Sequence, residues 1–132
     1  KAQFLLENGN ANEALKYYKR ALELEPNQVL LNIGYARALN SVGEYKSSVN
    51  LLKNVYVKDP NNGRLLRELA TAYSQIGETG WASLLTAERH ALYGKFKDAM
   101  HHAKRALGTS LPGSIEWLKA EDLILDIKNM GK

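Results

Sequence analysis

Few side chains in this 132-residue sequence have the type and spacing that catalysis or metal binding requires. It contains no cysteine, which excludes thiol catalysis, thiolate metal sites and disulfides. Its histidines are His90, His101 and His102, and none belongs to the HExxH pattern of zinc proteases. Asp98 and His102 are four residues apart, which we interpret as ordinary exposed side chains. We expect no metal, no cofactor and no catalytic residue within this chain.

The charge pattern indicates solvated helix faces. Lys and Arg number 18 against 14 Asp and Glu, a net charge of +4, and the two signs alternate along the chain. No apolar run approaches the ~20 residues that span a membrane. We therefore expect no nucleic-acid partner and no membrane insertion. Because the sequence begins at Lys1 without a methionine, we expect it to be a fragment of a longer protein.

Internal repetition is the strongest signal in the sequence. Gly43 follows Gly9 by 34 residues, Gly77 follows Gly43 by 34, and Pro60 follows Pro26 by 34. A 34-residue period with helical patterning is typical of stacked helix pairs. Small residues fit where two helices press together, a glycine ends the first helix of a pair, and a proline separates the pairs.

These residues resemble the tetratricopeptide repeat, with Ala14, Tyr18, Ala21 and Pro26 in the first unit and Leu66, Leu69, Ala70 and Tyr73 in the third. The resemblance covers most of residues 1–132 and implies a single all-α domain, an antiparallel helix-pair solenoid. We expect about eight helices, with the first repeat truncated at its N-terminus and a capping helix at the C-terminus. Their expected ranges are 1–8, 11–24, 28–41, 45–58, 63–76, 80–93, 96–108 and 114–129.

The period breaks once, because Gly94 follows Gly77 by only 17 residues. Helix 80–93 is therefore either the second helix of one pair or the first helix of the next. If it is a first helix, Trp81 and Leu84 face the same wall as the preceding first helices. We expect an irregularity near Gly77–Gly80, where two glycines also suggest a hinge.

The last third of the chain, from Ala87-Glu88 through Leu92-Tyr93-Gly94 to Gly113–Asp122, resembles the C-terminal repeat region of bacterial periplasmic zinc metalloproteases that assist outer-membrane barrel assembly (BepA-like). That resemblance implies a periplasmic location, with the cytoplasm as the alternative. It also implies partners such as the protease domain of the parent protein or components of barrel assembly. The protease residues themselves would lie outside this chain.

Binding is the function that remains. In the family, the concave wall comes mainly from the first helix of each pair, and this wall holds peptides. The chaperone-binding members clamp a C-terminal carboxylate with a defined Lys, Asn and Arg set, from which this sequence departs because Ile33 stands where a Lys is expected. Arginines among amides and hydroxyls suit an extended acidic peptide or a C-terminal carboxylate. The resemblance implies a groove lined by Leu30, Ile33, Arg37, Asn40, Arg64, Arg67, Thr71, Ser74 and Gln75.

We therefore expect a non-catalytic protein-interaction domain, the substrate- or partner-recruiting arm of a larger periplasmic metalloprotease. The alternative is a free-standing repeat adaptor or a scaffold for pilus or secretion assembly. An enzyme or nucleic-acid binder is the least favoured hypothesis. Because a truncated first helix leaves an apolar face uncovered, we also expect the chain to form homodimers.

Overall fold

The computed structural model describes residues 10–130, which form seven α-helices and no strand. An all-α fold is confirmed, and each expected helix in this range agrees with the observed one to within one residue at either end. The expected helix 1–8, and the dimer hypothesis that depends on it, fall outside the described residues. The helices are α2 (Ala11–Leu24), α3 (Val29–Ser41), α4 (Tyr45–Lys58), α5 (Gly63–Gln75), α6 (Thr79–Leu92), α7 (Phe96–Thr109) and α8 (Ile115–Met130).

Local hydrogen bonds explain where the helices end and begin. Gly43 and Gly77 adopt φ values of +83° and +85°, a left-handed conformation that side chains disfavour. Past Gly77, the Glu78 N–H donates to the Tyr73 carbonyl at 2.9 Å, which satisfies a carbonyl at the end of α5. At the start of α5, the Asn62 Oδ1 accepts from two backbone N–H groups at 3.1 Å each. These signals place the turns at the observed positions.

The turn at Gly77 gives a testable prediction. Gly77→Ala should lower the free energy of unfolding by about 1 kcal/mol, because an L-residue is strained at positive φ although no atom lies within 4 Å of the added Cβ. Gly108→Ala is the matched control, since Gly108 is helical and its Cβ would also meet nothing. That control should be neutral or slightly stabilising. Urea denaturation measures both, and equal effects would contradict the turn assignment.

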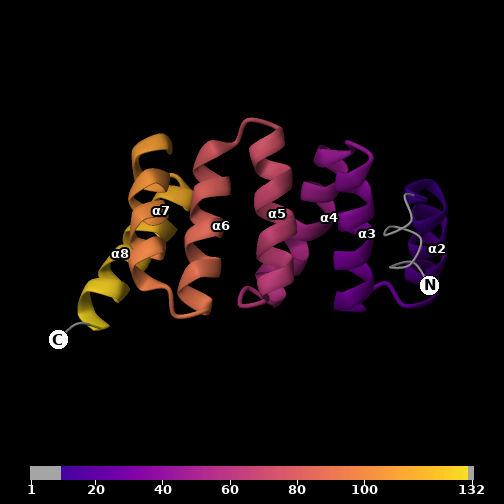
Figure 1. Cartoon of the computed structure of the whole chain (residues 1–132), viewed down its shortest axis with the longest axis horizontal. Coiled ribbons are helices and arrows are strands. Elements are labelled where there is room, and N and C mark those ends of the chain that lie inside the picture. The colour runs from indigo at the N-terminus through magenta and orange to yellow at the C-terminus, as the bar shows by residue number, and fades with distance from the viewer. Residues whose placement is uncertain (1–9, 131–132) are drawn as a thin grey trace.

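The helices follow one another along the long axis, each packed on the next (Figure 1). The first helix of one pair also contacts the first helix of the next pair, as α3 contacts α5. At the other end α6 contacts α8, whereas no contact joins α5 to α7 within the described part of the chain. Helix α6 therefore takes the first-helix position toward α7 and α8. It directly follows another first helix, α5.

The double role of α6 explains the break in the period. Leu84 and Leu85 are both fully buried but face different neighbours. Leu85 joins the core built by α3, α4 and α5, while Leu84 packs with Ala106 of α7 and Ala120 of α8. Gly80 is also buried in α6, where an added Cβ would collide with the Ser110 hydroxyl. This glycine serves close packing, and the hinge expected near Gly77–Gly80 stays a prediction.

Helix α8 closes the described stack. Ser114 Oγ accepts the Trp117 N–H at 3.4 Å, and Ala120 and Ile124 are buried against α6 and α7. Its outer face is less polar than a cap requires, since Leu118 and Leu125 are about half exposed there (47% and 51%). None of the described helices combines the length and the apolar composition that a membrane span needs.

Candidate functional site

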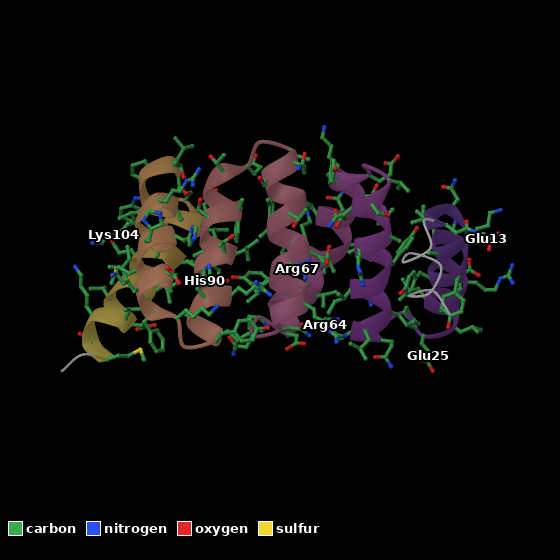
Figure 2. All side chains as sticks on the ribbon, viewed as in Figure 1. Glu13, Glu25, Arg64, Arg67, His90 and Lys104 are labelled. Atoms are coloured by element: carbon green, nitrogen blue, oxygen red, sulfur yellow. The ribbon has the colours of Figure 1, made fainter. Side chains whose placement is uncertain are left out.

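Two neighbouring cavities share Arg67 of α5 and together form what we call the groove (Figure 2). The α3–α5 cavity has a volume of about 550 Å³ and is lined by Tyr18, Leu30, Ile33, Gly34, Arg37, Arg64, Arg67 and Glu68. The α6–α7 cavity has a volume of about 440 Å³. Helix α5 contributes Leu66, Arg67, Ala70, Thr71, Ser74 and Gln75 to it, and α6 and α7 contribute Thr79, Ala82, Ser83, Thr86, Arg89, His90, His102 and Arg105.

The structure brings most of the expected groove residues together. Of the two apolar side chains, Leu30 is 61% exposed, whereas Ile33 is only 6% exposed and forms part of the core. Ile33 therefore forms the floor of the α3–α5 cavity, and Leu30 is the apolar side chain that a ligand can reach. The α3–α5 cavity holds Leu30, Ile33, Arg37, Arg64 and Arg67, and the α6–α7 cavity holds Arg67, Thr71, Ser74 and Gln75.

Asn40 is the exception among the expected groove residues. It is buried and lines neither cavity. Its Nδ2 donates to the Glu68 backbone carbonyl at 3.1 Å and to the Glu68 Oε1 at 3.2 Å. Placing Asn40 in the groove was wrong, because its amide is enclosed where α3 and α5 cross and ties the two helices together.

The residues that α6 presents to the groove also differ from expectation. Trp81 and Leu84 do not line it, since Leu84 is buried toward α7 and α8 and Trp81 stacks on Tyr73 with ring centroids 5.5 Å apart. The adjacent face of α6, which includes Ala82, Thr86 and Arg89, lines the cavity instead. The large apolar side chains of α6 pack into the two hydrophobic cores on either side of the helix. The face that lines the cavity therefore carries small and polar side chains.

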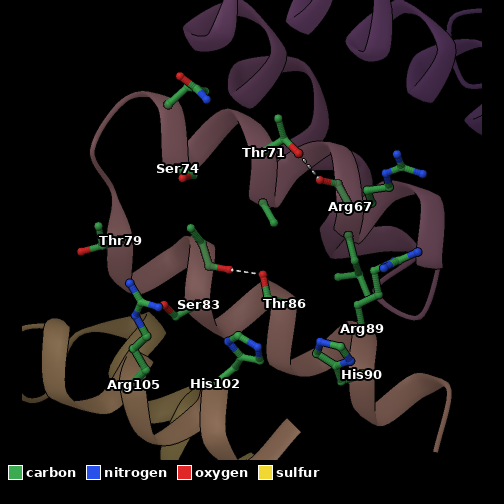
Figure 3. A pocket seen from close by; sticks show the side chains of 14 residues that line it. Arg67, Thr71, Ser74, Thr79, Ser83, Thr86, Arg89, His90, His102 and Arg105 are labelled. Carbon is green, nitrogen blue, oxygen red and sulfur yellow. Dashed lines mark hydrogen bonds between the residues drawn. The ribbon is translucent and has the colours of Figure 1, made fainter. Parts of the chain in front are cut away.

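The α6–α7 cavity is strongly basic (Figure 3). Three arginines line it, Arg67, Arg89 and Arg105, and no aspartate or glutamate of the described part of the chain does. The Arg89 guanidinium lies over the Tyr93 ring, with Cζ 5.3 Å from the ring centroid, and this stacking restrains its position. Guanidinium groups donate in pairs to carboxylates, so this end of the groove favours anionic ligands.

The hydroxyl groups of Thr71 and Thr86 have no free proton to donate to a ligand. Thr71 Oγ1 donates to the Arg67 carbonyl at 3.0 Å and Thr86 Oγ1 donates to the Ala82 carbonyl at 2.8 Å (Figure 3). Each hydroxyl has one proton, and that proton is used within its own helix. The charged donors for an anionic ligand are the arginines, and Ser74, Gln75, Thr79 and Ser83 also line the cavity.

Two histidines from different helices meet in this cavity. The rings of His90 on α6 and His102 on α7 are stacked, with centroids 5.2 Å apart and planes 6° from parallel. Burial lowers the pKa of His102, and His90, His101 and Arg105 lower it further, while Asp98 opposes them. Within residues 10–130, no group of three or more His, Asp or Glu side chains is arranged to hold a metal ion.

Sequence reasoning missed His90, His102, Arg89 and Arg105 as groove residues. These side chains reach the groove only because α7 packs beside α6. Because the period breaks here, the sequence did not show which face of either helix would line the groove. The available signal was the run Arg89-His90, followed twelve residues later by His102 and then Arg105, which repeats a histidine–arginine pairing on two adjacent helices. That pattern becomes informative only once α6 is known to be a first helix.

A separate aromatic cluster joins α4, α5, α6 and α8 away from the groove. Trp81 stacks on Tyr73 and meets Tyr56 edge-on, with centroids 6.3 Å apart. The Tyr56 hydroxyl donates to Glu88 Oε1 at 2.7 Å, and burial raises the pKa of the Glu88 carboxyl. Lys119 Nζ lies 5.3 Å from the centroid of the Tyr56 ring. This cluster braces the junction at which the period breaks.

Sequence comparison matches part of the chain to known proteins. The family model of the tetratricopeptide repeat matches residues 5–48. A stretch of 65 residues is 40% identical to tetratricopeptide repeat protein 8 of Caenorhabditis elegans. That stretch covers 49% of this chain and only 13% of the nematode protein.

Structure comparison matches nearly the whole chain. A structure of MamA from residue 41 to its end, from Desulfovibrio magneticus RS-1, gives a TM-score of 0.67 at 16% identity, covering 98% of this chain and 71% of that one. Another crystal structure of MamA gives 0.63 at 16% identity, covering 98% and 95%. At such identities the likeness concerns the fold alone. Stacked helix pairs of this kind present extended surfaces that bind other proteins.

Proposed function

Because the chain folds as a tetratricopeptide-repeat solenoid and its N-terminal part matches that repeat in sequence, we propose that it recruits a partner protein by holding an acidic segment of that partner in the groove. The observation that carries the proposal is the composition of the groove. Five arginines line its two adjoining cavities: Arg37, Arg64, Arg67, Arg89 and Arg105. Among the described residues that line it, Glu68 is the only acidic one, and it accepts a hydrogen bond from Asn40.

The two ends of the groove suit different parts of one ligand. The exposed Leu30 and the floor residue Ile33 offer an apolar contact in the α3–α5 cavity. The α6–α7 cavity offers cations, and none of the described residues that line it is acidic. A segment that places an apolar residue a few positions from clustered carboxylates would use both ends.

At a finer level, we propose that this domain is the partner-recruiting arm of a larger periplasmic metalloprotease that assists outer-membrane barrel assembly. The support is the resemblance of the last third of the sequence to the repeat region of such proteases. On this proposal the groove takes either barrel-assembly components or the protease domain of the same protein. The second candidate is a free-standing adaptor or assembly scaffold in the cytoplasm, which the fold accommodates equally well.

The proposal is tested by titrating the protein with a fluorescent peptide that carries one leucine and a run of alternating Asp and Glu, with anisotropy as the readout. We expect saturable binding that weakens as salt rises, because the contacts are charge-assisted. A peptide with Asn and Gln in place of the acids is the control and should not bind. No saturable binding of the acidic peptide, or tighter binding of single-stranded DNA, would contradict the proposal.

A further inference from the structure

Building on the proposed function, we propose that the α6–α7 cavity binds clustered carboxylates together with protons, which His90 and His102 take up when the acidic segment enters. The groove would then hold its ligand more tightly as the pH falls below neutral. The cavity provides the geometry for such coupling, because both rings line it beside Arg67, Arg89 and Arg105. Nothing in the sequence spacing alone places these five side chains together.

The stacked arrangement disfavours a positive charge on both rings at once when the groove is empty. With centroids 5.2 Å apart, two protonated imidazoles would repel each other across a partly buried space. The charged groups around His102 are His90 on α6 and His101, Arg105 and Asp98 on α7. Arg67 on α5 and Arg89 on α6 line the same cavity. All of these except Asp98 disfavour a positive charge on the ring.

An acidic ligand reverses this balance. Two or more carboxylates in the cavity would supply the negative charge that the lining lacks, and an imidazolium can donate from both ring nitrogens. Binding therefore raises the affinity of the rings for protons. By linkage, lowering the pH through the histidine range raises the affinity for the ligand by the same factor.

Other ligand classes fit these observations less well. The rings of His90 and His102 are stacked 6° from parallel, and within the described residues no group of three or more metal-ligating side chains forms around them. An apolar ligand would leave three guanidinium groups facing it. Carboxylates of Asp and Glu stay ionised above about pH 5, so they remain partners over the whole range in which histidine titrates.

The test measures the affinity of the Asp/Glu peptide for the whole chain at several values between about pH 8 and about pH 5.5. We expect wild-type affinity to rise about tenfold on acidification, roughly the effect of one unit of pKa change shared by the two rings. The double variant His90→Gln/His102→Gln should lose this rise. His101→Gln is the comparison variant: His101 is exposed and lines neither cavity, but its ring contacts that of His102, with centroids 5.2 Å apart, so this variant should keep the rise in affinity although the pH at which it occurs can shift.

Two outcomes would overturn the inference while leaving the proposed function intact: wild-type affinity that does not change with pH, or a pH response that persists in the double variant. Absence of binding at every pH would overturn both. If the double variant does not fold, NMR titration of the wild-type rings replaces it. The pKa values of His90 and His102 should then rise when the peptide is added, and unchanged values would contradict the proposal.

Discussion

Leu85→Ala is expected to remove about 3 kcal/mol from the free energy of unfolding. Leu85 is fully buried in the core that α3, α4, α5 and α6 share, and truncating it leaves a cavity between helices that cannot easily close. The loss is large against the roughly 5–15 kcal/mol that stabilises a typical domain. It should be large because this side chain attaches α6 to the N-terminal helices at the point where the period breaks.

The matched control lies on the same helix. Leu92 is 40% exposed at the end of α6, so Leu92→Ala should cost less than about 1 kcal/mol. Chemical denaturation followed by circular dichroism measures both variants. Similar losses in the two would show that α6 does not pack on the N-terminal core as described.

Arg67→Glu is expected to have the largest effect on binding, weakening the acidic peptide by about tenfold or more, since a hydrogen bond to a charged group contributes about 1.5 kcal/mol or more. Arg67 is the residue common to both cavities of the groove. Reversing its charge removes a donor and places a carboxylate against the carboxylates of the ligand. Anisotropy titration of the variant measures the change.

The control for this variant must carry the same change in net charge. Lys104 is exposed on α7 and lines neither cavity, so Lys104→Glu changes net charge equally without touching the groove. It should weaken binding by less than about threefold, through the general field of the protein. Equal losses in both variants would mean that overall charge, and not the groove, attracts the peptide.

The helices could be predicted from the sequence because their signals are local. A 34-residue spacing of glycines and prolines fixes the turns, and small residues such as Ala14 and Ala36 mark where helices cross. The same period predicted a shared groove for residues that the structure places in two adjoining cavities, Leu30, Arg64 and Arg67 in one and Arg67 and Thr71 in the other, and their role in binding stays a prediction. Both predictions rely on each pair repeating the geometry of the pair before it.

The prediction failed where that assumption ends. Two first helices follow each other at α5 and α6, and the residues facing the groove on α6 then depend on which core each apolar side chain joins. Trp81 and Leu84 were misplaced for this reason. Asn40 was misplaced for a different reason. A side-chain amide on the expected face can already donate to a neighbouring helix, as the Asn40 Nδ2 does to Glu68 of α5. The histidine pair required contact between helices that the sequence does not encode locally.

The central claim is that the groove engages a partner through acidic sequence, and a photocrosslinking amino acid at Thr71 tests it most directly. Thr71 is exposed and lines the groove, and substituting it leaves every arginine in place. Glu121, exposed on α8 and outside both cavities, is the control position. In an extract with envelope and cytosolic proteins, we predict crosslinks from Thr71 to Asp- and Glu-rich segments that excess acidic peptide abolishes. Crosslinks that the peptide does not displace, or equal capture from Glu121, would contradict the account.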